Sequence, residues 1–87
     1  MLNITVYGPG CAKCKEAERR VRHVVEASAM EANITKATNP VDMAKAGILA
    51  TPAIAINGVI KVSGRVPNED DIKVWINESL VRTTVEK

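Results

Sequence analysis

The sequence is poor in aromatic residues, in net charge and in cysteine, and these shortages exclude several classes of fold and function for the protein. Its 87 residues include one Trp, one Tyr and no Phe. The formal net charge is only +2, and basic and acidic side chains are interleaved, unlike the concentrated positive charge of nucleic-acid-binding domains. We therefore expect no nucleic-acid partner. A chain this short buries roughly 60% of its unfolded surface, which favours one compact domain.

The chain also lacks a long hydrophobic stretch. No apolar run approaches the roughly 20 residues that span a bilayer. Residues 1–5, Met-Leu-Asn-Ile-Thr, have neither the positive charge nor the apolar segment of a signal peptide. We expect a protein that is soluble, does not contact membranes and resides in the cytoplasm. Its apolar balance fits a monomer.

Only two cysteines are present, Cys11 and Cys14, and they can close only a very short loop. The loop-entropy model gives such a bridge less than the roughly 3 kcal/mol expected for a loop of about 15 residues. In a reducing compartment it would not persist as a structural staple. A reactive or metal-binding pair is therefore a better interpretation than a structural disulfide.

Hydrophobic periodicity and turn residues predict the order strand, helix, strand, short helix, hairpin, helix. The predicted elements are a strand over 2–7, a helix over 11–29, a strand over 32–37, a short helix over 41–46, strands over 53–56 and 59–62, and a helix that follows Asn68. Asn57-Gly58 suits the two positive φ angles of a type I′ hairpin turn. We expect residues 81–87 to be a frayed tail.

These elements predict an α/β fold over a single domain, residues 1–87. The connection between the first two strands is long enough for a right-handed crossover, which makes them parallel. The hairpin strands are antiparallel to each other. The expected architecture is βαβαββα, with a four-stranded mixed sheet flanked by helices.

The Cys-x-x-Cys motif lies between the first predicted strand and the long helix, within residues 8–14 (GPGCAKC). A helix N-terminus stabilises an anion, so we expect the pKa of Cys11 to lie below the ordinary value of about 8.5, with Lys13 favouring the thiolate further. Cys14 lies one turn later and faces inward. The spacing predicts that Cys11 is an exposed nucleophile and that Cys14 is the shielded thiol that resolves a mixed disulfide.

A proline stands directly before the third predicted strand, in Thr51-Pro52. With the Cys-Ala-Lys-Cys motif, the Asn57-Gly58 hairpin and the order of elements, the chain resembles thioredoxin-fold proteins over about residues 2–81. It is most similar to the small glutaredoxin-like proteins described as redox-active disulfide proteins. The resemblance implies a thioredoxin-like fold and a thiol-disulfide oxidoreductase that reduces protein disulfides. It also implies no bound cofactor and electrons from a flavin-dependent reductase using NADPH.

The resemblance further implies a cis Thr51-Pro52 bond beside Cys11. In that family the cis bond keeps the two sulfurs free of metal and exposes the Thr51 backbone to an extended segment of the substrate. Tyr7, at the end of the first strand, either packs under the loop or flanks the substrate groove. Thr51, Pro52 and Tyr7 are therefore the candidate substrate-binding residues.

The chain departs from the family patterns in several places. No Trp precedes Cys11, and Ala12-Lys13 replaces the Gly-Pro of thioredoxins. Residues 63–67 lack the motif with which glutaredoxins hold glutathione. No acid occupies the place of the buried proton acceptor of thioredoxins, because Glu16 and Glu18 are expected to project into solvent.

A second class of function uses the same two thiolates. A strand, a Cys-x-x-Cys loop and a helix also begin the small metal carriers of ferredoxin-like topology, which bind Cu(I) or Zn²⁺. Those carriers have a Met two residues before the first cysteine and end in a strand, whereas here Pro9-Gly10 precedes Cys11 and the last predicted element is a helix. The redox interpretation, which we favour, assigns no metal site.

Overall fold

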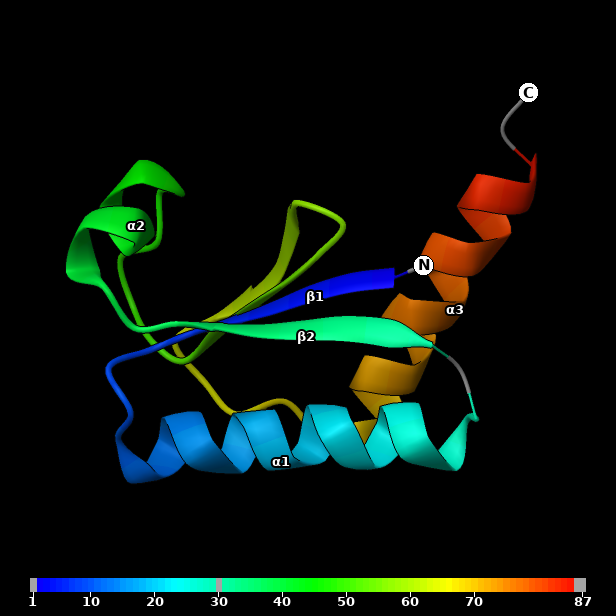
Figure 1. Cartoon of the computed structure of the whole chain (residues 1–87), viewed down its shortest axis with the longest axis horizontal. Coiled ribbons are helices and arrows are strands. Elements are labelled where there is room, and N and C mark those ends of the chain that lie inside the picture. Colours follow the sequence, from blue (N-terminus) through cyan, green and yellow to red (C-terminus); the bar gives the residue numbers. More distant parts are fainter. Residues whose placement is uncertain (1, 30, 86–87) are drawn as a thin grey trace.

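The computed structural model describes residues 2–29 and 31–85, with side chains described as far as Ser79. Its elements follow the predicted order (Figure 1). They are β1 Leu2–Tyr7, α1 Ala12–Ala27, β2 Ala32–Ala37, α2 Pro40–Lys45, β3 Ala53–Ile56, β4 Val59–Ser63 and α3 Glu69–Val85. The α/β fold class is therefore confirmed, and most boundaries lie within two residues of their predicted positions.

The C-terminal helix is longer than expected. Helix α3 continues to Val85, so most of the tail expected over 81–87 is helical. The sequence contains neither Gly nor Pro between Leu80 and Val85 to end the helix. Residues 86–87, the rest of that tail, lie outside the described part of the chain.

The four strands form one mixed sheet in the order β2-β1-β3-β4. Strands β1 and β2 are parallel, and β3 is antiparallel to both β1 and β4. The hairpin turn has φ angles of 51° at Asn57 and 84° at Gly58, which confirms the predicted type I′ geometry. The parallel pairing of β1 and β2 leaves their C-terminal ends at the same edge of the sheet, where α1 and α2 begin.

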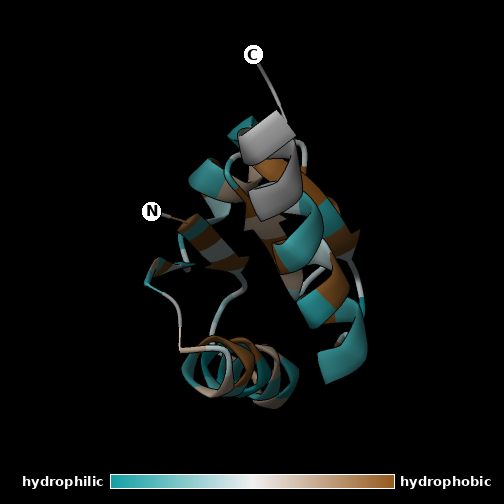
Figure 2. Cartoon of the chain, turned by 90° about the vertical axis from the view of Figure 1, so that its right-hand side faces the viewer, coloured by the Kyte–Doolittle hydropathy of each residue, from teal (hydrophilic) through white to brown (hydrophobic). Residues whose placement is uncertain are grey.

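Alternate residues of β1 face two different apolar clusters. Leu2, Ile4 and Val6 belong to the larger cluster, with residues of α1 and α3 such as Val21 and Ile72. Tyr7 packs instead against a smaller cluster around α2. Helices α1 and α3 therefore cover one face of the sheet and α2 part of the other, and Figure 2 shows α1 end-on with α3 beside it.

Two polar contacts tie α1 to the start of α3. Arg20 donates a hydrogen bond to the carbonyl of Pro67 over 2.9 Å, and His23 Nδ1 lies 2.8 Å from Glu69 Oε2. They fix the long helix that carries both cysteines. None of the helices within residues 2–29 and 31–85 combines the length and the apolar character needed to cross a bilayer.

Candidate active site

Cys11 caps the N-terminus of α1 and is exposed to solvent. Gly10 before it has a φ of 93°, a conformation that glycine adopts easily and that turns the chain from β1 into the helix. The Cys11 backbone is extended, and its carbonyl accepts the hydrogen bond of Lys15 N–H over 3.0 Å. Its thiol makes no capping bond. The sulfur therefore stands at the open end of the helix, within reach of another protein.

Cys14 is the shielded member of the pair, with 5% of its surface exposed. It lies on the buried stripe of α1 that also contains Ala17 and Val21. Both cysteines are reduced, and their sulfur atoms are 2.9 Å apart. The two sulfur atoms are therefore close enough to form a disulfide when the pair is oxidised. The predicted exposure of Cys11 and burial of Cys14 are both observed.

The two thiols have pKa values shifted in opposite directions. The pKa of Cys11 is lowered first by the hydrogen bond from the Cys14 side chain and then by backbone groups of Cys14 and Lys13. Burial raises the pKa of Cys14, and its contact with Cys11 raises it further. Cys11 therefore ionises first, and the Cys14 thiol then donates its hydrogen bond to the Cys11 thiolate.

The predicted cause of the low Cys11 pKa is only partly the observed one. The backbone amides of the first turn contribute, as expected for a helix N-terminus, but the neighbouring thiol contributes most. Lys13 lowers the pKa of Cys11 through a hydrogen bond from its backbone amide. A contribution from the exposed Lys13 ammonium group stays a prediction.

The side chain of Cys14 packs against the backbone of Gly8, a contact that the sequence pattern did not indicate. A Cβ atom at this buried position would collide with Cys14 Sγ and would lie 3.8 Å from Thr51 Cβ. The Gly8 amide donates to the Ala37 carbonyl over 3.0 Å, which fixes this backbone against the end of β2. Cys14, Gly8 and Thr51 are consequently neighbours, although they come from three separate segments.

The Thr51-Pro52 peptide bond is cis, as the resemblance implied. Ser63 Oγ donates to the Ala50 carbonyl and the Gly64 amide donates to the Pro52 carbonyl, each over 2.9 Å. These two bonds hold the loop before β3 on the end of β4. Pro52 is fully buried and Thr51 half-buried. Within the described residues, the Thr51 backbone takes part in none of the loop hydrogen bonds, so its polar groups are available.

Tyr7 lies at the end of β1 and packs with Met43, Ile48 and Ala53. This is the packing alternative of the two weighed from the sequence. Tyr7 is half-buried rather than fully enclosed, so its contact with a substrate stays a prediction.

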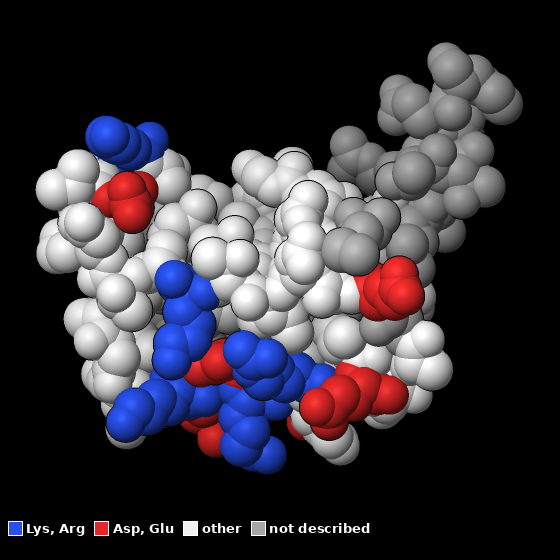
Figure 3. Space-filling view, in the orientation of Figure 1, with Lys and Arg blue, Asp and Glu red and all other residues white. Residues whose placement is uncertain are grey.

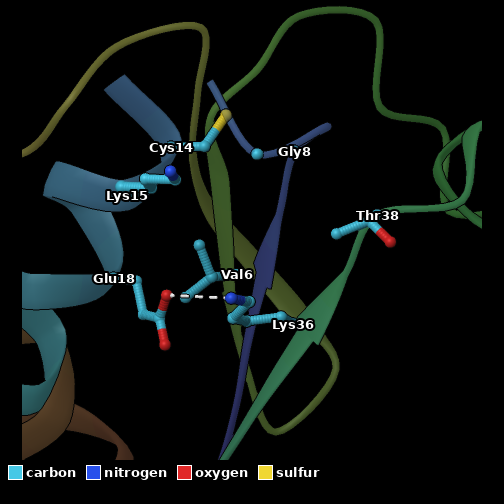
Figure 4. A pocket seen from close by; sticks show the side chains of 8 residues that line it. Val6, Gly8, Cys14, Lys15, Glu18, Lys36 and Thr38 are labelled. Carbon is cyan, nitrogen blue, oxygen red and sulfur yellow. Dashed lines mark ion pairs between the residues drawn. The ribbon is translucent and has the colours of Figure 1, made fainter. Parts of the chain in front are cut away.

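A small pocket of about 60 Å³ lies below Cys14, between α1 and the ends of β1 and β2. Figure 4 shows Cys14 at its upper end and Glu18 and Lys36 pointing toward each other across it. Its lining consists of Val6, Gly8, Gly10, Cys14, Lys15, Glu18, Lys36 and Thr38.

The expectation that Glu18 projects into solvent is wrong. Its side chain is only 17% exposed and lines this pocket; Arg22 Nε donates to it over 2.9 Å, and Lys36 Nζ lies 3.5 Å away. Burial opposes ionisation, but the two cations outweigh it and lower the pKa of Glu18. The carboxylate is therefore charged at neutral pH. Its spacing of four residues from Cys14 was a signal for this position, but Lys36 comes from a different element.

The residues of the site offer few ligands to a metal ion. Within residues 2–29 and 31–85, no group of three or more His, Cys, Asp or Glu side chains is arranged to hold one. The topology also differs from the ferredoxin-like arrangement of the metal carriers, since the last element is helix α3.

A readily ionised thiol in contact with a shielded thiol can exchange disulfides. Here the two thiols lie at the N-terminus of α1, which packs on a mixed β-sheet, and the loop with the cis Thr51-Pro52 bond is nearby. Fold and site together define the class: a thiol-disulfide oxidoreductase of thioredoxin fold. The family model described as "Thioredoxin domain" matches residues 2–77, and the chain belongs to this family.

Two curated archaeal proteins named thioredoxin are similar to this chain. The one from Methanothermobacter thermautotrophicus is 34% identical over 73 residues, which cover 84% of this chain and 95% of the relative. The one from Methanocaldococcus jannaschii is 33% identical over 73 residues, which cover 84% of each chain.

A solved structure of thioredoxin-2 from the malaria parasite has a similar fold. It superposes with a TM-score of 0.70 over 90% of this chain and 82% of that one. At 12% identity, this likeness concerns the fold alone. That protein is described as a component of the parasite's protein secretion machinery.

Proposed function

We propose that this protein reduces disulfide bonds in other proteins. The observation that carries the proposal is the pair of sulfurs 2.9 Å apart, with Cys11 exposed and of lowered pKa, and Cys14 buried and of raised pKa. The attacking and resolving thiols of an exchange reaction need these two different environments. The name thioredoxin borne by the two archaeal relatives supports the same activity.

The reaction is a two-electron exchange in two steps. The Cys11 thiolate attacks one sulfur of the partner disulfide, which breaks the partner S–S bond, forms a mixed disulfide and releases one partner thiolate. Cys14 then loses its proton and attacks Cys11 Sγ, which releases the second partner thiolate. The partner takes up two protons from water as a dithiol, and the chain is left with a Cys11–Cys14 disulfide.

The loop around Thr51 supplies a binding surface for the partner. In the described part of the chain, the backbone N–H and C=O of Thr51 take part in none of the hydrogen bonds that hold this loop, and Thr51 lies beside Cys14 and Gly8. An extended segment of the partner that pairs with this backbone would gain affinity from main-chain hydrogen bonds. Pro52 shapes the loop, and Tyr7 is the candidate for a flanking contact.

The oxidised chain needs an electron donor to turn over. We assign this role to a flavin-dependent reductase that uses NADPH, with no cofactor bound to the chain itself. We place the reaction in the cytoplasm, where reducing conditions keep structural disulfides rare, and we propose that the protein acts as a monomer.

The activity is tested by insulin reduction with dithiothreitol as the reductant. The native chain should precipitate insulin faster than dithiothreitol alone, and Cys11→Ser should abolish the acceleration. In the Cys14→Ser variant the mixed disulfide on Cys11 should persist and be recoverable on a non-reducing gel. A matched control is Cys11→Ser/Cys14→Ser, which forms no adduct. Equal insulin reduction by native chain and Cys11→Ser would overturn the proposal.

A further inference from the structure

Positive charge is concentrated at the end of α1 that carries the cysteines. We call this the α1 basic surface, formed by Lys13, Lys15, Arg19, Arg22 and Lys36. All five side chains are exposed. Figure 3 shows Lys and Arg side chains gathered along α1, at the lower edge of this face.

Shared contacts connect three members of the α1 basic surface, Lys15, Arg22 and Lys36, across α1 and β2. Lys15 and Lys36 line the same pocket below Cys14. Glu18 contacts both Arg22 and Lys36 and so joins the helix to the strand. The part of the surface formed by Lys15, Arg22 and Lys36 therefore lies on the side of α1 that faces β2.

Part of this positive charge is not neutralised. In the described part of the chain, no carboxylate forms an ion pair with Lys13 or Lys15, whereas Arg19 is paired with Glu16. Arg22 and Lys36 share the single carboxylate of Glu18. Five cations thus stand against two carboxylates here, while the whole chain has a net charge of only +2.

The sign of the exposed charge changes along α1, from positive near Cys11 to negative near the C-terminal end of the helix. Beyond Arg22, the exposed charged residues at the far end are Glu26 and Glu31, which are acidic. Lys13 and Lys15 follow Cys11 by two and four residues, an axial distance of about 3–6 Å at the helical rise. This is shorter than the Debye length of about 8 Å at physiological ionic strength. A partner covalently joined to Cys11 is therefore within the field of these lysines.

We propose that the α1 basic surface selects protein partners whose reactive disulfide is flanked by carboxylates. The inference rests on the proposed disulfide reductase function and specifies its partner. Complementary charge steers the encounter and favours acidic over basic partners. The carboxylates of Glu16 and Glu18 within the surface make it a poor match for the uniform negative charge of nucleic acid.

The test uses two synthetic peptides of equal length, each with one intramolecular disulfide, flanked in one by aspartates and in the other by lysines. The second-order rate constant for oxidation of the reduced protein is measured with each. We expect the acidic peptide to react at least about tenfold faster at low ionic strength, and the two rates to converge in about 0.5 M salt. Equal rates at low ionic strength would overturn the inference.

Charge-reversal variants locate the effect. Lys15→Glu should reduce the ratio of acidic to basic peptide rates at least about threefold, and Lys36→Glu should act in the same direction. Lys73→Glu makes the same charge change at an exposed position of α3, away from the α1 basic surface, and should leave the ratio as in the native chain. Using the ratio within each variant cancels any effect on the Cys11 thiolate. A ratio that falls equally in Lys73→Glu would show that net charge, not this surface, is responsible.

The uncharged reagent hydroxyethyl disulfide separates this inference from the proposed function. If it oxidises the protein through Cys11 while the two peptides react equally, only the charge selection fails. If neither it nor the peptides react, the reductase function itself fails.

Discussion

Cys14 Sγ rests against the bare backbone of Gly8, in the space that a side chain at position 8 would occupy. Gly8 has no positive φ, unlike Gly10, so the absence of a side chain is its contribution rather than a special backbone conformation. The sulfur is thereby held 2.9 Å from Cys11. The geometry of the dithiol depends on a residue outside the Cys-x-x-Cys motif.

Gly8→Ala should separate the two sulfurs, because the new methyl group and Cys14 Sγ compete for one place. We expect the Cys11 pKa to rise, since its largest lowering contribution comes from the Cys14 thiol. Thiolate absorbance against pH measures this shift. Gly10→Ala is the control: its Cβ would meet no atom within 4 Å, and its cost is a left-handed backbone worth about 1 kcal/mol of stability. A Cys11 pKa unchanged in Gly8→Ala would contradict the argument.

Replacement of Cys14 tests the hydrogen bond directly. Cys14→Ala should raise the pKa of Cys11, because it removes the largest contribution that lowers it. Cys14→Ser keeps a donor and should raise it less. The pH dependence of the alkylation rate of Cys11 by iodoacetamide reports both values. In the native chain at pH 7, Cys11 should be alkylated before Cys14. A Cys11 pKa in Cys14→Ala equal to that of the native chain would mean that the backbone amides alone lower it.

The positions and the different exposures of the two cysteines could be predicted because they depend on local structure. A strand that ends in Gly-Pro-Gly, followed by a helical pattern, places Cys11 at the helix start and Cys14 on the apolar stripe, where the structure has them. Gly8 and Glu18 depend on tertiary contacts. The Cys14 sulfur is packed against Gly8, and Glu18 contacts Lys36, which comes from β2. Helical periodicity carries no information on either contact.

The ion pairs of Glu18 make a pH-dependent contribution to stability. Because its pKa in the folded chain is lowered below the ordinary 4.5, the contribution is complete above that pH and is lost as the pH falls through the lowered value. Glu18→Gln should lower the free energy of unfolding at pH 7 by about 0.5–1 kcal/mol, since Arg22 and Lys36 are largely exposed. Urea denaturation of the native chain and of Glu18→Gln, at pH 7 and at pH 2.5, measures the difference in the free energy of unfolding at each pH.

The control for that experiment is Glu26→Gln, on the same helix: Glu26 is exposed, and within residues 2–29 and 31–85 it forms no ion pair. Its effect on stability should be small at both pH values. A Glu18→Gln difference that is as large at pH 2.5 as at pH 7 would show that packing, rather than charge, accounts for it.

Ser63 should affect substrate binding more than the chemistry. Its hydroxyl donates to the Ala50 carbonyl over 2.9 Å and holds the loop that carries Thr51. Ser63→Ala removes this bond and should cost about 0.5–1.5 kcal/mol of stability. We expect a several-fold higher KM for a disulfide peptide, because the Thr51 backbone is less well positioned. The rate with hydroxyethyl disulfide, which is too small to pair with a strand, should change little.

Ser63→Thr, which keeps the donor, is the control and should restore the KM. An equal loss of rate with the peptide and with the small disulfide would place the effect of Ser63 on the cysteines instead of on the binding loop.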